Sequence, residues 1–204
     1  MIGLVGFTIA PLALASYNSV AIYKNGSYFM KNNDDKTKFT ASVIVLSDKG
    51  SKGERKDLSG PKATELLEQN GYIVRKSILL PDEPELLKSE LIRLTDEEKV
   101  DLIITSGGTG FSLRDNTPEA TLAVADRNAP GIAEAIRAES LKITGHAMLS
   151  RGVSVIRKQT LIINLPGSPK AVKESLEYIL QYIDHGMAVL KGSAFDCAEE
   201  EKKQ

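Results

Sequence analysis

Continuous apolar runs alternate with amphipathic stretches from about residue 39 to about residue 184. The runs predict buried strands, because they are rich in β-branched residues and are followed by glycine, proline or polar residues; they cover 41–46, 73–80, 100–104 and 160–165. Leucine and isoleucine at helical spacing predict helices over about 59–70, 84–94, 117–127, 132–143 and 169–184, with a short one near 146–150. Strands that alternate with helices predict an α/β fold, in which a mostly parallel sheet has helices on both faces.

Several of the predicted helices begin with a polar residue close to a proline, a combination that favours the first helical turn. Ser59, Thr117 and Ser168 are therefore expected to be N-caps. Asp82 has two interpretations: it is the N-cap of the next helix, or it is a carboxylate that shares a cleft with Asp115. The local pattern favours the cap.

Composition narrows the possible classes of function. The 204 residues are 42% apolar, which is enough for one domain with a full core and short tails. The net charge of −1 gives no overall field that would recruit nucleic acid or a membrane surface. The single cysteine, Cys197, excludes an internal disulfide framework and a multi-cysteine zinc site. His146 and His185 are far apart in sequence, so a histidine-rich metal site is not expected and both are interpreted as structural or surface residues.

The polarity of the chain predicts three parts: an N-terminal extension (1–38), a globular domain (39–195) and a charged tail (196–204). The apolar run 1–15 is shorter than the ~20 residues that span a membrane and lacks the basic start of a secretory signal. The polar stretch 24–38 is typical of a linker. The extension is expected to be partly disordered. An extra hairpin, a fully disordered arm, a start upstream of the natural one and, with less weight, a signal or anchor all stay open.

A glycine-rich segment after the strand 100–104 is the main candidate for chemistry. Its small residues allow backbone N–H groups to approach an anion closely, and a charged pair and a helix start follow them. This order of elements predicts a phosphate site, as α/β proteins build it. The residues of this predicted site are Ser106, Gly107, Gly108, Thr109, Gly110, Arg114 and Thr117.

The glycine segment alone is a weak signal. Leu113 occupies the position of the third glycine of a dinucleotide-binding motif, and no Gly-Lys-Ser/Thr follows as in a P-loop. A tight strand-to-helix turn without a ligand therefore has equal weight. Two further polar loops, 47–60 and 166–168, also follow predicted strands. In a parallel sheet all three loops would lie along one edge.

Many short motifs, spread over residues 40–193, together resemble the molybdopterin-binding domain of the Mog and MoaB family. So many motifs in one order are more specific than any one of them, and the pair 149–151 and 155–158 is more similar to the Mog branch, the molybdopterin adenylyltransferases. In chain order the motifs are 46–48, 57–61, 80–83, 106–110, 114–115, 117–121, 125–127, 130–131, 149–151, 155–158 and 165–170.

The resemblance implies a three-layer α/β sandwich, a homotrimer and a cytoplasmic enzyme. The implied reaction joins molybdopterin and ATP, with Mg²⁺, to give adenylylated molybdopterin and pyrophosphate. The implied next step is hand-over of this product to a separate enzyme that inserts the metal. Whether that metal is molybdenum or tungsten stays open.

The essential acidic residues of the family correspond to Asp82 and Asp115. We hypothesise that their carboxylates hold Mg²⁺ on the triphosphate through hard oxygen ligands. Pro166, Gly167 and Ser168 complete the predicted substrate-binding set, with Ser168 as a contact to the pterin or its phosphate. Arg157 and Lys158 are weaker candidates, because a basic pair is usually a solvated face.

Two other classes of function remain as alternatives. The first is a non-catalytic module that binds molybdopterin or scaffolds other proteins; the retained Asp82 and Asp115 argue against it. The second is a generic nucleotide-binding or oxidoreductase domain, and the missing nucleotide motifs argue against that. No nucleic-acid or membrane partner is expected.

Overall fold

The computed structural model of the chain describes residues 19–24, 27–32 and 39–192. The chain divides into two compact units, Met1–Thr37 and Lys38–Gln204. The apolar run at the N-terminus, the charged C-terminal tail and Cys197 lie outside the described residues.

The described part of the first unit is a β-hairpin. Strand β1 (Ser19–Lys24) pairs antiparallel with β2 (Ser27–Asn32). Of the alternatives left open for the N-terminal extension, an extra hairpin is the one that agrees with the pairing of these residues. No helix among the described residues is long and apolar enough to cross a membrane.

A six-stranded mixed sheet forms the centre of the second unit, with the strand order β4-β3-β5-β8-β7-β6. The first four strands in that order are mutually parallel. Strand β7 is antiparallel to β8, and β6 is antiparallel to β7. The predicted mostly parallel sheet is therefore confirmed. The strands are β3 (Thr40–Leu46), β4 (Ile73–Leu80), β5 (Leu102–Ser106), β6 (Arg127–Asn128), β7 (Ser154–Arg157) and β8 (Thr160–Leu165).

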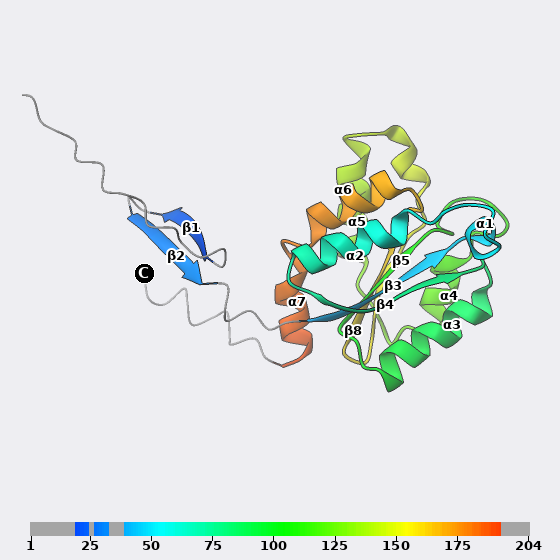
Figure 1. Cartoon of the computed structure of the whole chain (residues 1–204), viewed down its shortest axis with the longest axis horizontal. Coiled ribbons are helices and arrows are strands. Elements are labelled where there is room, and N and C mark those ends of the chain that lie inside the picture. Colours follow the sequence, from blue (N-terminus) through cyan, green and yellow to red (C-terminus); the bar gives the residue numbers. More distant parts are fainter. Residues whose placement is uncertain (1–18, 25–26, 33–38, 193–204) are drawn as a thin grey trace, which may run out of the picture. The chain divides into compact units, whose positions relative to one another are not determined.

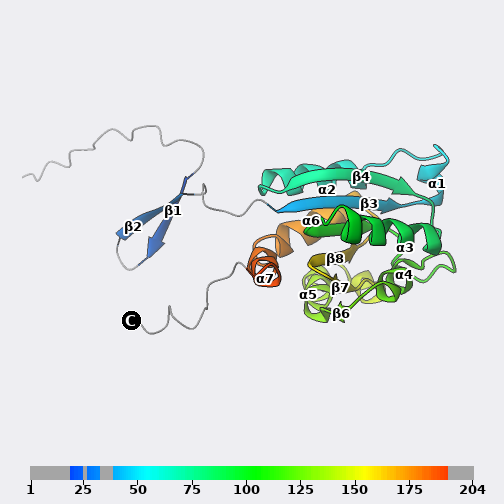
Figure 2. The same ribbon diagram turned by 90° about the horizontal axis from the view of Figure 1, so that it is seen from below.

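Helices cover both faces of this sheet, which makes the three-layer sandwich (Figures 1 and 2). One face packs against α2 (Ser59–Gln69), α5 (Pro130–Leu141), α6 (Pro169–Ile179) and α7 (Ile183–Leu190). The other face packs against α3 (Pro84–Ile92) and α4 (Thr117–Ala123). Three short elements complete the unit: α1 (Asp48–Ser51), the π-helical turn η2 (Arg93–Glu97) and the 3₁₀ turn η3 (Gly145–Leu149).

Each central strand contributes to two separate cores. On β3, Val43 and Val45 face the helices α2 and α6, whereas Ile44 and Leu46 face α3 and α4. All four side chains are buried. Because side chains alternate between the two faces of a strand, a strand covered on both faces is apolar at most of its positions. This explains the continuous apolar run from which the strand was predicted.

The predicted N-cap at Ser168 is confirmed, since its Oγ accepts a hydrogen bond from Ala171 N at 3.2 Å. The cap prediction at Ser59 is wrong. Asp57 Oδ1 accepts from Ser59 N at 2.9 Å and from Gly60 N at 3.1 Å, so Asp57 satisfies the free N–H groups of α2. The Ser59 hydroxyl instead donates to the carbonyl of the loop after β8.

Two other helix starts also differ from the predicted ones. Helix α4 begins after Asn116, and Thr117 lies inside its first turn rather than capping it. Helix α3 begins after Glu83, so Asp82 is not its N-cap. Helix α4 also ends at Ala123, before the predicted 127, and the predicted helix 169–184 is divided into α6 and α7.

Strands β6 and β7 were not predicted, and they change the interpretation of Arg157. Its guanidinium donates to Asp96 Oδ2 at 2.6 Å and to Val124 O at 2.9 Å. Arg157 pairs in the sheet with Thr160, at the amino end of β8. The basic pair of Arg157 and Lys158 thus lies at the edge opposite the glycine-rich loop, where Asp96 neutralises both side chains.

Candidate anion-binding site at the carboxyl ends of the parallel strands

The four parallel strands end along one edge of the sheet, and their loops surround a cleft of about 500 Å³. The predicted grouping of three polar loops is therefore correct. The predicted site residues that line the cleft are Asp82, Gly107, Gly108, Asp115, Gly167 and Ser168. Both exposed histidines lie elsewhere, on η3 and α7.

Glycine is required at positions 107 and 108, where the loop after β5 passes between the ends of β3 and β8. Gly107 has φ +107°, and a Cβ there would lie 2.3 Å from the backbone oxygen of Leu46. Its N–H donates to Leu165 O at 3.2 Å. Gly108 has φ +63°, and a Cβ there would lie 2.3 Å from Thr117 Oγ1. The loop is thus clamped between the ends of β3 and β8, with its backbone close to the cleft.

The three hydroxyl residues of the predicted site are in the protein interior rather than in the cleft. Ser106, Thr109 and Thr117 are buried, and none of them lines the cleft. Ser106 Oγ donates to Pro166 O at 3.0 Å, which ties the loop after β5 to the loop after β8. These four residues of the predicted substrate-binding set, Pro166 included, thus lie outside the lining of the cleft.

Asp82 is held by a reciprocal pair of hydrogen bonds with Asp48. Asp82 Oδ2 accepts from Asp48 N at 2.9 Å, and Asp48 Oδ1 accepts from Asp82 N at 3.1 Å. Partial burial raises the pKa of the Asp82 carboxyl above its usual range, and the negative charges of Asp48 and Asp115 add to the increase. A cation in the cleft would therefore relieve an unfavourable charge.

Asp115 is oriented by its own loop. Its Oδ2 accepts from Ser112 N at 2.9 Å, and a Cβ on Gly110 would lie 2.9 Å from the same oxygen. In the described part of the chain, neither Asp82 nor Asp115 forms an ion pair. Two carboxylates without a basic partner, in one cleft, are the oxygen ligands that Mg²⁺ prefers. The described residues hold no metal-binding cluster of three or more acidic, histidine or cysteine side chains, so a metal here would need further ligands from a bound molecule or water.

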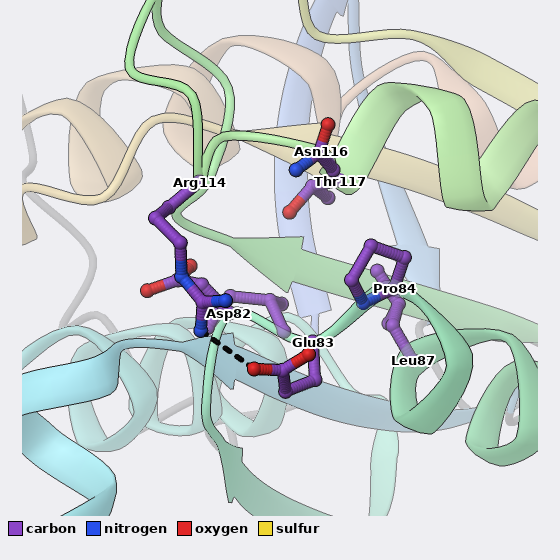
Figure 3. A pocket seen from close by; sticks show the side chains of 8 residues that line it. Asp82, Glu83, Pro84, Leu87, Arg114, Asn116 and Thr117 are labelled. Atoms are coloured by element: carbon purple, nitrogen blue, oxygen red, sulfur yellow. Dashed lines mark hydrogen bonds and ion pairs between the residues drawn. The ribbon is translucent and has the colours of Figure 1, made fainter.

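Arg114 links the loops instead of facing the cleft. Its guanidinium donates to both oxygens of Asp48, at 3.0 and 2.8 Å. It also donates to Glu83 Oε1 at 2.8 Å (Figure 3). Hydrogen bonding to Arg114 lowers the pKa of Asp48. Together with Asp82 and Thr117, Arg114 lines a cavity only large enough for about one water molecule, beside the main cleft. It thus fixes Asp48, which in turn fixes Asp82.

Arg151 lies in one of the family motifs, but no role was predicted for it. Its Nε donates to Gly110 O at 2.7 Å, and its Nη atoms contact Asp115 O and Glu119. Its backbone N–H donates to Thr109 O at 2.9 Å. The glycine-rich loop is therefore held from the far side by one side chain. Nothing local in the sequence links Arg151 to a loop some forty residues earlier.

Arg55 and Lys56 were also missed. Both line the cleft, are exposed and follow β3 in the polar loop that was predicted at the ligand-binding edge. Neither side chain has a hydrogen bond or an ion pair in the described part of the chain. Their position after a buried strand was the signal that could have identified them.

The fold and the cleft define an α/β domain with a candidate ligand site at the carboxyl ends of its parallel strands. Residues 42–185 match the family described as "probable molybdopterin binding domain". The chain belongs to this family, and the resemblance predicted from the motifs is confirmed.

Relatives of known name agree with this assignment. The chain is 43% identical over 152 residues to the molybdopterin adenylyltransferase of Haemophilus influenzae, covering 74% of this chain and 76% of the relative. It is 45% identical over 137 residues to the protein of the same name from Escherichia coli K12, covering 66% and 70%. Among solved structures, the molybdopterin biosynthesis enzyme MoaB from Thermus thermophilus superposes with a TM-score of 0.72 at 45% identity, covering 76% of this chain and 97% of that one.

Proposed function

We propose that the protein acts in molybdenum cofactor biosynthesis as a molybdopterin adenylyltransferase. Its relatives carry that name at 41–45% identity. The observation in the structure that supports the activity best is the cleft itself, which is lined by the glycine-rich loop and by Asp82 and Asp115, neither of which has a basic partner among the described residues. A module that only bound molybdopterin would have no need of two such carboxylates.

The proposed reaction is an attack of the terminal phosphate of molybdopterin on the α-phosphorus of ATP. A new P–O bond forms, the bond from the α-phosphorus to the bridging oxygen breaks, and pyrophosphate leaves with the electron pair. Since the attacking group is already an anion, no base is needed. The difficulty is charge repulsion between the two substrates, so catalysis consists mainly of positioning and neutralisation.

The residues divide these tasks. Gly107 and Gly108 line the cleft with backbone that has no side chain, so phosphate oxygens can approach it closely. Gly167 and Ser168 place the N-terminus of α6 at the same cleft. Asp82 and Asp115 would hold Mg²⁺, which would neutralise phosphate charge when bound.

The proposed activity is tested by incubating the full chain with ATP, MgCl₂ and molybdopterin. We expect pyrophosphate release that depends on molybdopterin, and a pterin product whose mass has increased by one adenylyl group. Tight binding of molybdopterin without pyrophosphate release would instead support the binding or scaffolding module.

Further features of the family stay predictions for this chain. We expect a homotrimer, hand-over of the product to a metal-insertion enzyme and a cytoplasmic location. Light scattering on the purified chain measures the first of these. A mass of one or two chains would contradict the trimer without affecting the proposed reaction.

A further inference from the structure

The charge of the cleft poses a problem for the proposed substrates. Its charged lining residues are Arg55, Lys56, Asp57, Asp82 and Asp115, which sum to a net charge of −1. ATP and pyrophosphate carry several negative charges, and like charges in a partly enclosed cleft repel each other. A polyphosphate therefore needs cations of the protein's own in addition to any metal ion.

Only two basic side chains of the described lining are available for that task. Arg114 lies outside the main cleft and is occupied by Asp48 and Glu83. Arg55 and Lys56, in contrast, line the cleft and have no ionic partner among the described residues. Cations without an intramolecular partner lose no existing ion pair when an anion binds, so binding has a smaller cost.

The backbone holds this basic pair in place from both sides. Arg55 N donates to Lys49 O at 3.2 Å, which fixes the pair to α1. Asp57, the next residue after Lys56, caps α2 through its two hydrogen bonds. Ser59 Oγ donates to Gly167 O at 2.7 Å, so the start of α2 is joined to the loop before α6. The pair is thus presented beside the N-terminus of an eleven-residue helix whose preceding loop lines the same cleft.

We propose that Arg55 and Lys56 bind the β- and γ-phosphates of ATP, and hence the pyrophosphate that leaves. This assignment rests on the proposed function. Two adjacent, flexible cations match two linked phosphates better than one phosphate monoester, because each cation can then contact a separate charged group. The carboxylates of Asp82 and Asp115 stay with the metal ion, and the basic pair neutralises the part of the polyphosphate that departs.

The test is calorimetric titration of the full chain with pyrophosphate, with and without MgCl₂. For Arg55→Gln/Lys56→Gln we expect an affinity for pyrophosphate that is lower by on the order of tenfold or more, because two charge-assisted contacts are removed. The affinity for AMP, which lacks the β- and γ-phosphates, should change less than about threefold. The dependence of pyrophosphate affinity on salt should also be shallower in the double variant.

Lys49→Gln is the matched control. It removes one positive charge from the same segment, but Lys49 is exposed and does not line the cleft. We expect its pyrophosphate affinity to equal that of the wild type. An equal loss in Lys49→Gln and in the double variant would overturn the proposal, since it would show a general effect of net charge.

A parallel titration with molybdopterin identifies the source of the phosphate. If the double variant loses affinity for molybdopterin and keeps it for pyrophosphate, the pair binds the pterin phosphate and our assignment is wrong.

Failure of the assignment of the basic pair can be told apart from failure of the proposed function. Wild-type transfer activity with unchanged pyrophosphate affinity in the double variant refutes only the pair. Pyrophosphate affinity that depends on the pair, without any transfer, refutes only the adenylyltransferase.

Discussion

Aspartates at the two edges of the central sheet differ in whether they have a basic partner. At the amino-end edge, where the parallel strands begin, each main carboxylate is neutralised: Asp96 by Arg157 and Lys158, and Asp101 by Lys191. At the carboxyl-end edge, Asp82 and Asp115 have no basic partner among the described residues.

The pKa values follow this difference. The guanidinium of Arg157 holds the pKa of Asp96 well below its usual range, whereas burial and two nearby carboxylates raise the pKa of Asp82. The ion pair of Asp96 with Arg157 stabilises the fold. The carboxylate of Asp82 has no basic partner among the described residues, so its charge is left for a ligand to neutralise. The ionic partners of an aspartate, and not its residue type, therefore distinguish a structural role from a functional one.

The largest expected effect is on turnover. Asp82→Asn and Asp115→Asn should each lower kcat/KM for adenylyl transfer by roughly 10²–10³-fold, because each would remove a carboxylate ligand of the Mg²⁺ ion that would neutralise phosphate charge. Asp96→Asn, at the other edge, should leave kcat/KM within about twofold. Steady-state pyrophosphate release from the three variants measures this. Equal losses in all three would erase the functional difference between the edges.

Next in size is a loss of stability at the amino-end edge. Asp101 is buried; it accepts from Thr40 N at 2.7 Å and from Thr40 Oγ1 at 2.8 Å, and it pairs with Lys191. Asp101→Ala should lower the free energy of unfolding by about 3 kcal/mol, because it leaves a buried N–H and an ammonium without partners. Urea denaturation measures the change. A cost below about 1 kcal/mol would mean that this pair does not hold the edge together.

A smaller difference in stability is expected between alanine variants of two glycines with positive φ, one at each edge of the sheet. Gly107→Ala, whose Cβ would meet the Leu46 carbonyl, should cost about 3 kcal/mol. Gly71→Ala, with φ +88° and open space around its Cβ position, should cost about 1 kcal/mol from backbone conformation alone. The midpoints of thermal unfolding report both. Similar costs for the two variants would disprove the tight approach of the glycine-rich loop to β3.

The smallest effect is on the pH dependence of stability. An aspartate whose pKa is raised by folding destabilises the native state above that pKa, and the penalty disappears as pH falls towards the ordinary value of about 4. Asp82→Asn should therefore be slightly more stable than wild type at pH 7, with the difference vanishing near pH 4. Asp96 has a lowered pKa, so Asp96→Asn should be less stable from pH 7 down to about 4 and approach wild type only below that. Denaturation at several pH values should give these two opposite trends; parallel trends would contradict the assigned directions.

Local patterns predicted the parts of this molecule that depend on local contacts. The buried strand 160–165 and the Ser168 cap, which bonds three residues ahead, follow from neighbouring residues alone. The Ser59 hydroxyl bonds Gly167 O, 108 residues away, and Asp82 bonds Asp48, 34 residues away. Local patterns cannot indicate such partners, so Ser59 was predicted to be a helix cap, and for Asp82 the local pattern favoured a cap over a shared cleft with Asp115.

The missed elements have the same cause. Strand β7 is four residues long and ends in a charged residue, so its pattern resembles a solvated loop. Arg157 is held there by Asp96, 61 residues earlier. Asp82 and Asp115 line one cleft at the expected edge of the sheet, whereas Arg114 lines the small cavity beside it. Arg55 and Lys56, which were not among the predicted site residues, also line the cleft.

The most direct test of the difference between the edges is a crystal structure of the protein with Mg²⁺ and a non-hydrolysable ATP analogue. We expect the phosphates to bind in the cleft at the carboxyl ends of the strands. The metal ion should lie at Asp82 and Asp115, and the β- and γ-phosphates at Arg55 and Lys56. Phosphates bound at the amino-end edge, near Asp101 and Lys191, would contradict it.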